Sequence, residues 1–163
     1  MNAISARISA QAMMPPLPRS PDSEWLTRLP LRDFLELGAF PTAPGCARGH
    51  VANVLREWLL GALCEPAVMV ASELVTNSVL ATSGVRWTAG LPPVRLWMLG
   101  EPSLVVVLVW DAVTSAPVRR EADEDDESGR GLAIVDALSA RWGHYQPPAP
   151  FGGKVTWALI DSP

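Results

Sequence analysis

The chain has 163 residues, of which 48% are hydrophobic and 18% are charged. These values fit a single domain with enough chain to bury a core. The formal net charge of -4 and the sequence pI near 5.1 argue against a broad basic surface for nucleic acid. The two cysteines, Cys46 and Cys64, lack CxxC spacing, so neither a zinc site nor a disulfide framework is expected.

The uninterrupted apolar runs of the chain are short. The run from Leu104 to Trp110 has the length of a strand and is followed by an acid, whereas a bilayer span needs ~20 residues. The N-terminus carries Arg7, Ser9 and Gln11 and lacks the continuous apolar core of a signal peptide. We therefore expect a cytoplasmic protein without a membrane partner.

Residues 1 to about 30 contain several prolines and little periodicity, which is typical of a mobile extension. A single domain is expected over 31–163. Hydrophobic periodicity and turn residues predict its elements. In chain order these are an edge strand over Leu31–Phe40, helices over Ala47–Leu63 and Glu65–Ala81, strands over Pro93–Leu99 and Leu104–Trp110, an exposed loop over Asp111–Ser128, a helix over Gly131–Ala140, and strands over Arg141–Tyr145 and Lys154–Ile160.

This order predicts a two-layer α/β sandwich of the α+β class, in which helices cover one face of a mostly antiparallel sheet. The strand over Leu104–Trp110 is apolar on both faces, so we expect it at the centre of the sheet. The exposed loop includes the acidic run Glu121–Glu127, which is most simply a solvated segment.

Three short motifs carry the expected chemistry. Glu73 and Asn77 are four residues apart, so a carboxylate and a carboxamide share one face of a helix. Asp111 follows the apolar run that ends at Trp110. Gly129 and Gly131 bracket an arginine directly before a predicted helix, where backbone amides can approach phosphate oxygens without obstruction. Together the motifs indicate a nucleotide pocket, although each alone also fits an ordinary turn or a satisfied core pair.

The order of elements and these motifs resemble the ATP-binding domain shared by gyrase, histidine kinases and mismatch-repair ATPases, the GHKL superfamily with its Bergerat-type fold. Within it, the chain looks most similar to the bacterial anti-sigma-factor serine/threonine kinases. The resemblance covers about Phe34 to Ile160. It is strongest in residues 72–77 and 127–135, with support from 141–143 and 153–154.

The resemblance implies site residues that bind Mg²⁺ and ATP. Asn77 is expected to ligate Mg²⁺, which takes oxygen ligands and shares its other positions with water and phosphate. Glu73 is expected to act as general base toward a serine hydroxyl. The residues expected to bind the nucleotide are Asn77, Asp111, Gly129, Arg130, Gly131, Leu132 and Lys154. The acidic run before them is expected to form a lid.

By the same resemblance, Asp111 accepts a hydrogen bond from the amino group of adenine, where guanine presents a carbonyl. The alternative is an aspartate that starts a turn. Because the expected partner of Asp111 is the ligand, its loss should remove ATP binding and leave the fold intact. Lys154 either reaches the γ-phosphate or sits in solvent, and we favour the surface position slightly.

The chain departs from the family at two places near these residues. After Asp111 it reads Ala112 to Pro117, where the family usually has a glycine or a short Ser/Pro turn, so the pocket floor is expected to be narrower. Val155 stands where the family often has threonine, which puts a hydroxyl contact to the nucleotide in doubt.

Two functions therefore stay open. In the first, the chain is an ATP-binding serine/threonine protein kinase that phosphorylates an antagonist protein and controls transcription by partner switching. In the second, it is a nucleotide-binding module that binds a sigma factor or an antagonist without phosphoryl transfer. The retained Glu73 favours the kinase, and the departures favour the module. A homodimer is a possible assembly, because family members often work as dimers.

Overall fold

The structure is a computed structural model, and it describes residue 17 and residues 21–88, 90–117 and 131–162. A five-stranded antiparallel sheet has the strand order β1-β2-β3-β5-β4. The strands are β1 (Leu31–Gly38), β2 (Pro93–Glu101), β3 (Leu104–Asp111), β4 (Arg141–Tyr145) and β5 (Lys154–Asp161). The fold class and the order of the elements are those expected from the sequence.

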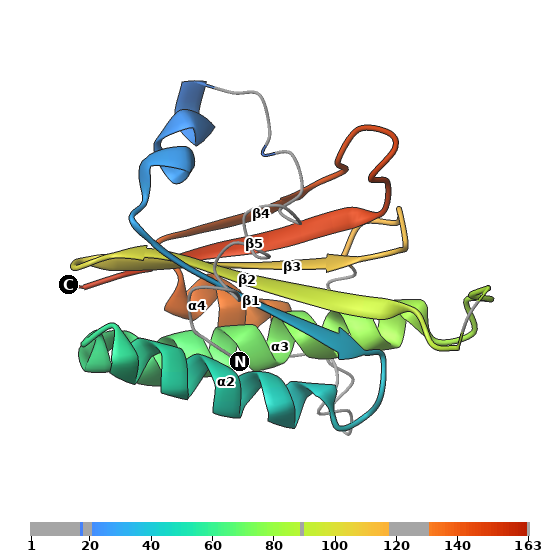
Figure 1. The fold of residues 1–163 in the computed structure, drawn as a ribbon, viewed down its shortest axis with the longest axis horizontal. Helices are drawn as coiled ribbons and strands as arrows, with labels where there is room; N and C mark the ends of the chain where they lie inside the picture. The colour runs from blue at the N-terminus through green and yellow to red at the C-terminus, as the bar shows by residue number, and fades with distance from the viewer. Residues whose placement is uncertain (1–16, 18–20, 89, 118–130, 163) are drawn as a thin grey trace.

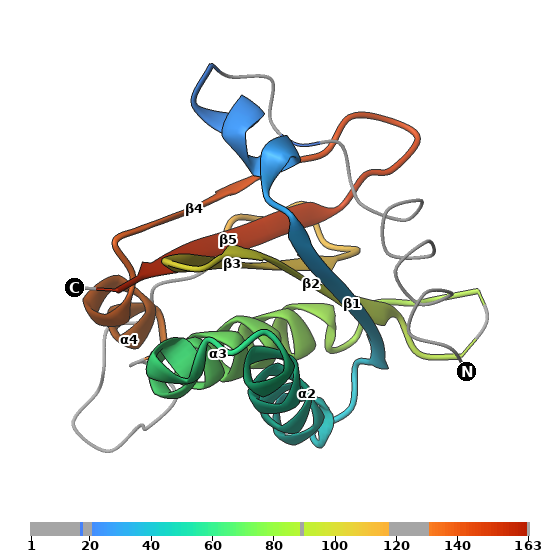
Figure 2. The same ribbon diagram turned by 60° about the vertical axis from the view of Figure 1, so that its left-hand side comes forward.

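In the described part of the chain, the α-helices lie on one face of this sheet, as Figures 1 and 2 show. They are α2 (Ala43–Glu57), α3 (Cys64–Thr82) and α4 (Gly131–Leu138). A short 3-10 helix, η1 (Pro21–Arg28), lies on the other side of the sheet. The result is a two-layer sandwich with an additional short element on the second face.

The first predicted helix differs from the observed one at both ends. Pro44 fits the first turn, where its missing N–H is not needed, so α2 begins at Ala43 rather than Ala47. The chain leaves the helix after Glu57 because Leu59 adopts a φ of 60° and Leu60 donates its N–H to the carbonyl of Leu55. Another 3-10 turn, η2 (Gly61–Leu63), then leads into α3.

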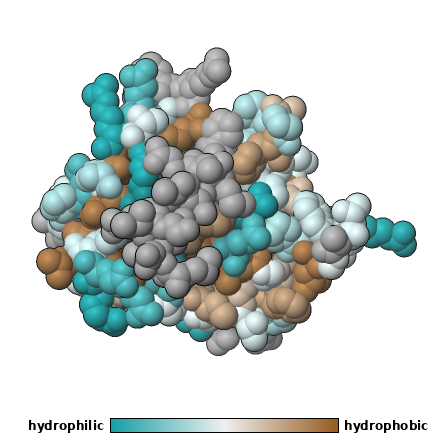
Figure 3. Space-filling model, in the orientation of Figure 1, coloured by the Kyte–Doolittle hydropathy of each residue, from teal (hydrophilic) through white to brown (hydrophobic). Residues whose placement is uncertain are grey.

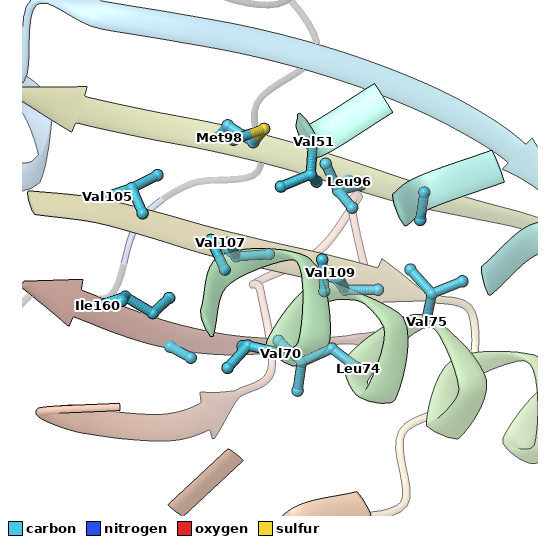
Figure 4. Close-up of a cluster of buried hydrophobic side chains, with 14 of the residues drawn as sticks. Val51, Val70, Leu74, Val75, Leu96, Met98, Val105, Val107, Val109 and Ile160 are labelled. Carbon is cyan, nitrogen blue, oxygen red and sulfur yellow. The ribbon is translucent and has the colours of Figure 1, made fainter. Parts of the chain in front are cut away.

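Successive side chains of a strand point to opposite faces of the sheet, so the sheet separates the core into two apolar clusters. On the helix-facing side, Val105, Val107 and Val109 of β3 pack against α2 and α3 (Figure 4). On the other side lie Val106, Leu108 and Trp110. β3 is therefore buried on both faces at the centre of the sheet, which confirms the expectation from its apolar run.

The second face of the sheet carries its own apolar cluster, in which Trp97, Leu99 and Leu108 are almost fully buried. Leu26 and Leu29, which lie within the segment assigned to an N-terminal extension, are buried in this cluster as well. The observed core therefore includes side chains that precede residue 31. Residues 1–16 and 18–20 lie outside the described part of the chain.

The segment Gly61–Thr82 is long and apolar enough to pass a length and composition test for a membrane span. In the fold, however, α3 packs along the sheet and buries side chains such as Val70, Leu74 and Val75 (Figure 4). Core helices pass such a test for the same reason, since they are apolar on most sides.

Candidate functional site

Glu73 and Asn77 lie one turn apart on α3 and flank the buried stripe of that helix. Each side chain is partly exposed, in agreement with a position at the edge of the helix–sheet interface. The Nδ2 atom of Asn77 is buried and has no hydrogen-bond partner among the described residues. An amide in this state can bind a further polar group, because buried polar atoms rarely stay unpaired.

Glu73 contacts the start of α4. A Cβ atom on Gly131 would lie 2.6 Å from Oε2 of Glu73, so the absence of a side chain at residue 131 permits the close approach. Burial raises the pKa of the Glu73 carboxyl, and the charge of Arg48 on α2 partly offsets this rise. Arg48 also donates a hydrogen bond to Ser72 Oγ at 2.8 Å, which holds it beside Glu73. A carboxylate with a raised pKa suits proton acceptance.

Asp111 is fully buried at the end of β3 and makes contacts to protein through both oxygens. Oδ1 accepts from the Val113 N–H at 3.0 Å and from Lys154 Nζ at 2.8 Å. Oδ2 accepts from Ser78 Oγ at 2.7 Å and again from Lys154 Nζ at 2.8 Å. Both oxygens of the Asp111 carboxylate are therefore bound within the fold in this structure, and the expected contact with a nucleotide base stays a prediction.

Lys154 is 2% exposed, so the favoured surface position for it is wrong. The cause is strand register. Lys154 is the direct partner of Asp111 in the β3–β5 ladder, and alternation turns both side chains toward the helices. The preceding Gly153 has a φ of 65°, and a Cβ atom there would overlap the carbonyl oxygen of Asp111. The glycine thus permits the close approach of the two strands that places the ion pair.

A cavity of about 110 Å³ lies next to this pair. It lies between the C-terminal half of α3, the segment after β3 and the start of β5. The lining residues are Asn77, Ser78, Leu80, Ala81, Ser115, Ala116, Pro117, Lys154 and Thr156. Ligand pockets usually measure about 300–1,000 Å³, so the described residues leave less room than a nucleotide needs.

The two ends of this site fit Mg-ATP differently. One end fits a metal-phosphate group. It contains the unpaired amide of Asn77, the carboxylate of Glu73 and Gly131, which has no side chain to obstruct a ligand. The described residues contain no cluster of three or more His, Cys, Asp or Glu side chains, so a metal held here would rely on phosphate and water oxygens. At the other end, Asp111 has no free acceptor for an adenine amino group, and the residues do not fit the base.

The remaining predicted residues have different outcomes. Gly131 and Leu132 begin α4, and the Leu132 side chain is buried in the core. Gly129, Arg130 and the acidic run Glu121–Glu127 lie outside the described residues, so their expected roles stay predictions. Ser115 to Pro117, part of the departure after Asp111, do line the small cavity.

The sequence interpretation missed Ser78 as a partner of Asp111 and missed the burial of Lys154. A signal for the second was present: Lys154 is the single lysine of the chain, and every other residue with a permanent positive charge is an arginine. Because arginine and lysine are not interchangeable, the use of lysine at this one position marked it as different from the others. Its partner was not predictable, because the β3–β5 register does not follow from the sequence pattern alone.

A second cavity of about 430 Å³ lies at the same end of the sheet on its other face. Trp87, Arg95, Trp110 and Phe151 are among its lining residues. None of the predicted site residues that the structure describes lines it, although Gly153, which precedes Lys154, does. The Arg95 guanidinium lies 4.9 Å from the centre of the Trp110 ring. The larger cavity is thus separate from the helix-facing site.

No family model and no curated protein matches the sequence. Among solved structures, the chain is similar to the RsbU and RsbW domains of Rv1364c from Mycobacterium tuberculosis, with a TM-score of 0.52 and 21% sequence identity. The similarity covers 82% of this chain and 33% of that chain. The chain has an RsbW-like two-layer fold. At this identity the similarity shows the fold, and the chain spans about a third of the length of the protein it matches.

Proposed function

We propose that this chain is a regulator of the partner-switching type, which binds a sigma factor or an antagonist protein and thereby controls transcription. The observation that carries the proposal is the placement of Glu73 and Asn77 on one face of α3, with Glu73 against the start of α4, in an RsbW-like fold. The contact between Glu73 and Gly131, which belong to two of the motifs that resemble anti-sigma-factor kinases, supports the proposal.

The kinase form of this function is supported by the end of the site formed by Glu73, Asn77 and Gly131, here called the phosphate end. Bound Mg-ATP would supply the phosphoryl group, and Asn77 would hold the metal through its carboxamide oxygen. The Glu73 carboxylate would accept the proton of a serine or threonine hydroxyl on the partner protein. The raised pKa of Glu73 supports this role.

The binding-module form is supported by the end of the site at which Asp111 was expected to bind the adenine base, here called the base end. Asp111 is bound by Lys154 and Ser78, and the adjoining cavity is small. Large hydrophobic side chains also reach the surface, and Figure 3 shows hydrophobic residues among hydrophilic ones on one face. Phe40 and Leu91 are both about half exposed and flank Ala39 and Pro92, which share a backbone hydrogen bond. Exposed apolar side chains that lie close together are typical of a surface that binds another protein.

Both forms are tested with purified sigma factors and antagonist proteins that are encoded in the same genome as this chain. Phosphotransfer is measured with labelled Mg-ATP, and partner binding is measured by biolayer interferometry with and without nucleotide. The kinase predicts labelling of one partner that is lost in Glu73→Ala. The binding module predicts partner binding without labelling of any partner. The affinity for the partner should fall in a double variant that carries Phe40→Ala and Leu91→Ala, and it should not change in Leu59→Ala. Absence of binding to every such protein would overturn the proposal.

A further inference from the structure

The carboxylate of Asp111 has no acceptor capacity left for a ligand. An ionised carboxylate offers about four lone-pair positions. In this structure four hydrogen bonds reach the two oxygens, one from Val113, one from Ser78 and two from Lys154. The side chain is fully buried, so no part of it faces solvent.

The Lys154 ammonium is fixed at this position by the fold around it. It lies within 2.8 Å of both Asp111 oxygens and is almost fully buried. The β3–β5 ladder places the two residues side by side, and Gly153 lets the strand approach the Asp111 carbonyl. A buried cation that loses its counter-ion is strongly disfavoured, so Lys154 does not leave Asp111 without a replacement for that interaction.

We propose that Lys154 is a built-in occupant of the base end of this site. Its ammonium occupies acceptor positions on both Asp111 oxygens, which the amino group of a purine base would have to use, so Lys154 and an adenine base exclude each other. The inference rests on the proposed function, because it takes the cavity on the helix-facing side of the sheet to be a nucleotide-binding site. It makes Lys154 the residue that sets the specificity of this site.

Two consequences follow for nucleotide binding. Any nucleotide that uses Asp111 must first displace Lys154, and its apparent affinity falls by the fraction of molecules in which Lys154 has moved. The wild-type chain should also fail to distinguish adenine from guanine, because the acceptor that would make the distinction is unavailable. Phosphate contacts through Asn77 and Gly131 do not use the Asp111 carboxylate and carry no base preference.

Calorimetry with Mg-ATP and Mg-GTP tests the exclusion. We compare the wild-type chain with Lys154→Thr, which frees Asp111, and with Arg141→Thr, a matched control that removes one positive charge from the exposed start of β4. Circular dichroism and a thermal melt establish that each variant is folded. Lys154→Thr should bind Mg-ATP at least about tenfold more tightly than the wild type and should prefer it to Mg-GTP, whereas Arg141→Thr should behave as the wild type.

Two calorimetric results would overturn the inference. One is tight, adenine-selective binding by the wild type that Lys154→Thr does not improve. The other is a folded Lys154→Thr that binds neither nucleotide better than the wild type does. In either case the partner-binding assays above still decide the proposed function, because they do not depend on Lys154.

A second measurement needs no variant. Lys154 is the single lysine, so a chain labelled with ¹⁵N-lysine gives one side-chain Nζ signal. A buried ammonium bound to Asp111 should exchange its protons slowly and give an observable signal in the wild type. Rapid exchange typical of a solvated lysine would overturn the inference even if Lys154→Thr did not fold.

Discussion

At the scale of single residues, Asp111 and Lys154 have a structural role that the sequence motifs did not indicate. The expectation from the motifs was that Asp111 contacts only a ligand, so that its substitution leaves the fold intact. Among the described residues, its loss leaves the buried Lys154 ammonium without the carboxylate that pairs with it. We therefore predict that Asp111→Asn lowers the free energy of unfolding by about 3–5 kcal/mol in urea denaturation. A change below about 1 kcal/mol would show that the carboxylate is not needed by the fold.

Glu73 provides a prediction on pH dependence. Its pKa is raised above the ordinary value of 4.5 because burial disfavours the ionised form. The folded state then holds the proton more tightly than the unfolded state, so this contribution to stability is complete below the ordinary value and is lost as the pH rises through the raised value. Glu73→Gln should remove that loss, and its advantage in stability over the wild type should grow with pH. Parallel curves of unfolding free energy against pH for the two proteins would contradict this.

At the scale of elements, the turn before β5 makes the approach of β5 to β3 possible. Gly152 and Gly153 both have positive φ, but only a Cβ atom at Gly153 would meet the Asp111 carbonyl and the Trp110 ring. Gly152→Ala is thus a matched control that carries the backbone cost alone, about 1–2 kcal/mol. Gly153→Ala should cost about 1–3 kcal/mol more, as measured by chemical denaturation. Equal costs would mean that the strands do not approach as closely as described.

Most elements could be predicted from sequence because their periodicity is local. The apolar run Leu104–Trp110 predicted a central strand, and β3 is buried on both faces. The end of α2 was not predictable, because a leucine with positive φ at residue 59 has no sequence signature. For the site, the four-residue spacing of Glu73 and Asn77 placed them on one helix face, whereas the Asp111–Lys154 contact depends on a register between distant strands.

At the scale of the whole molecule, the sheet is covered on both faces rather than on the helix side alone. Leu29 is 4% exposed in the cluster on the second face, although it lies in the segment interpreted as an extension. Leu29→Ala should therefore cost about 2–5 kcal/mol of unfolding free energy. The control is Leu59→Ala, whose side chain is 89% exposed and which should change stability by less than about 0.5 kcal/mol. Similar effects of the two substitutions would contradict burial of residue 29.

The central claim is that Asp111 is bound by Lys154 and is therefore not free for a base. A double-mutant cycle on the two residues tests it most directly, with Asp111→Asn, Lys154→Met and the double variant compared by urea denaturation. Each single change leaves a buried group unpaired, whereas the double change removes both charges. The double variant should therefore be less destabilised than the sum of the singles by about 2–3 kcal/mol. Additive effects would show that the two side chains do not interact and would contradict the account.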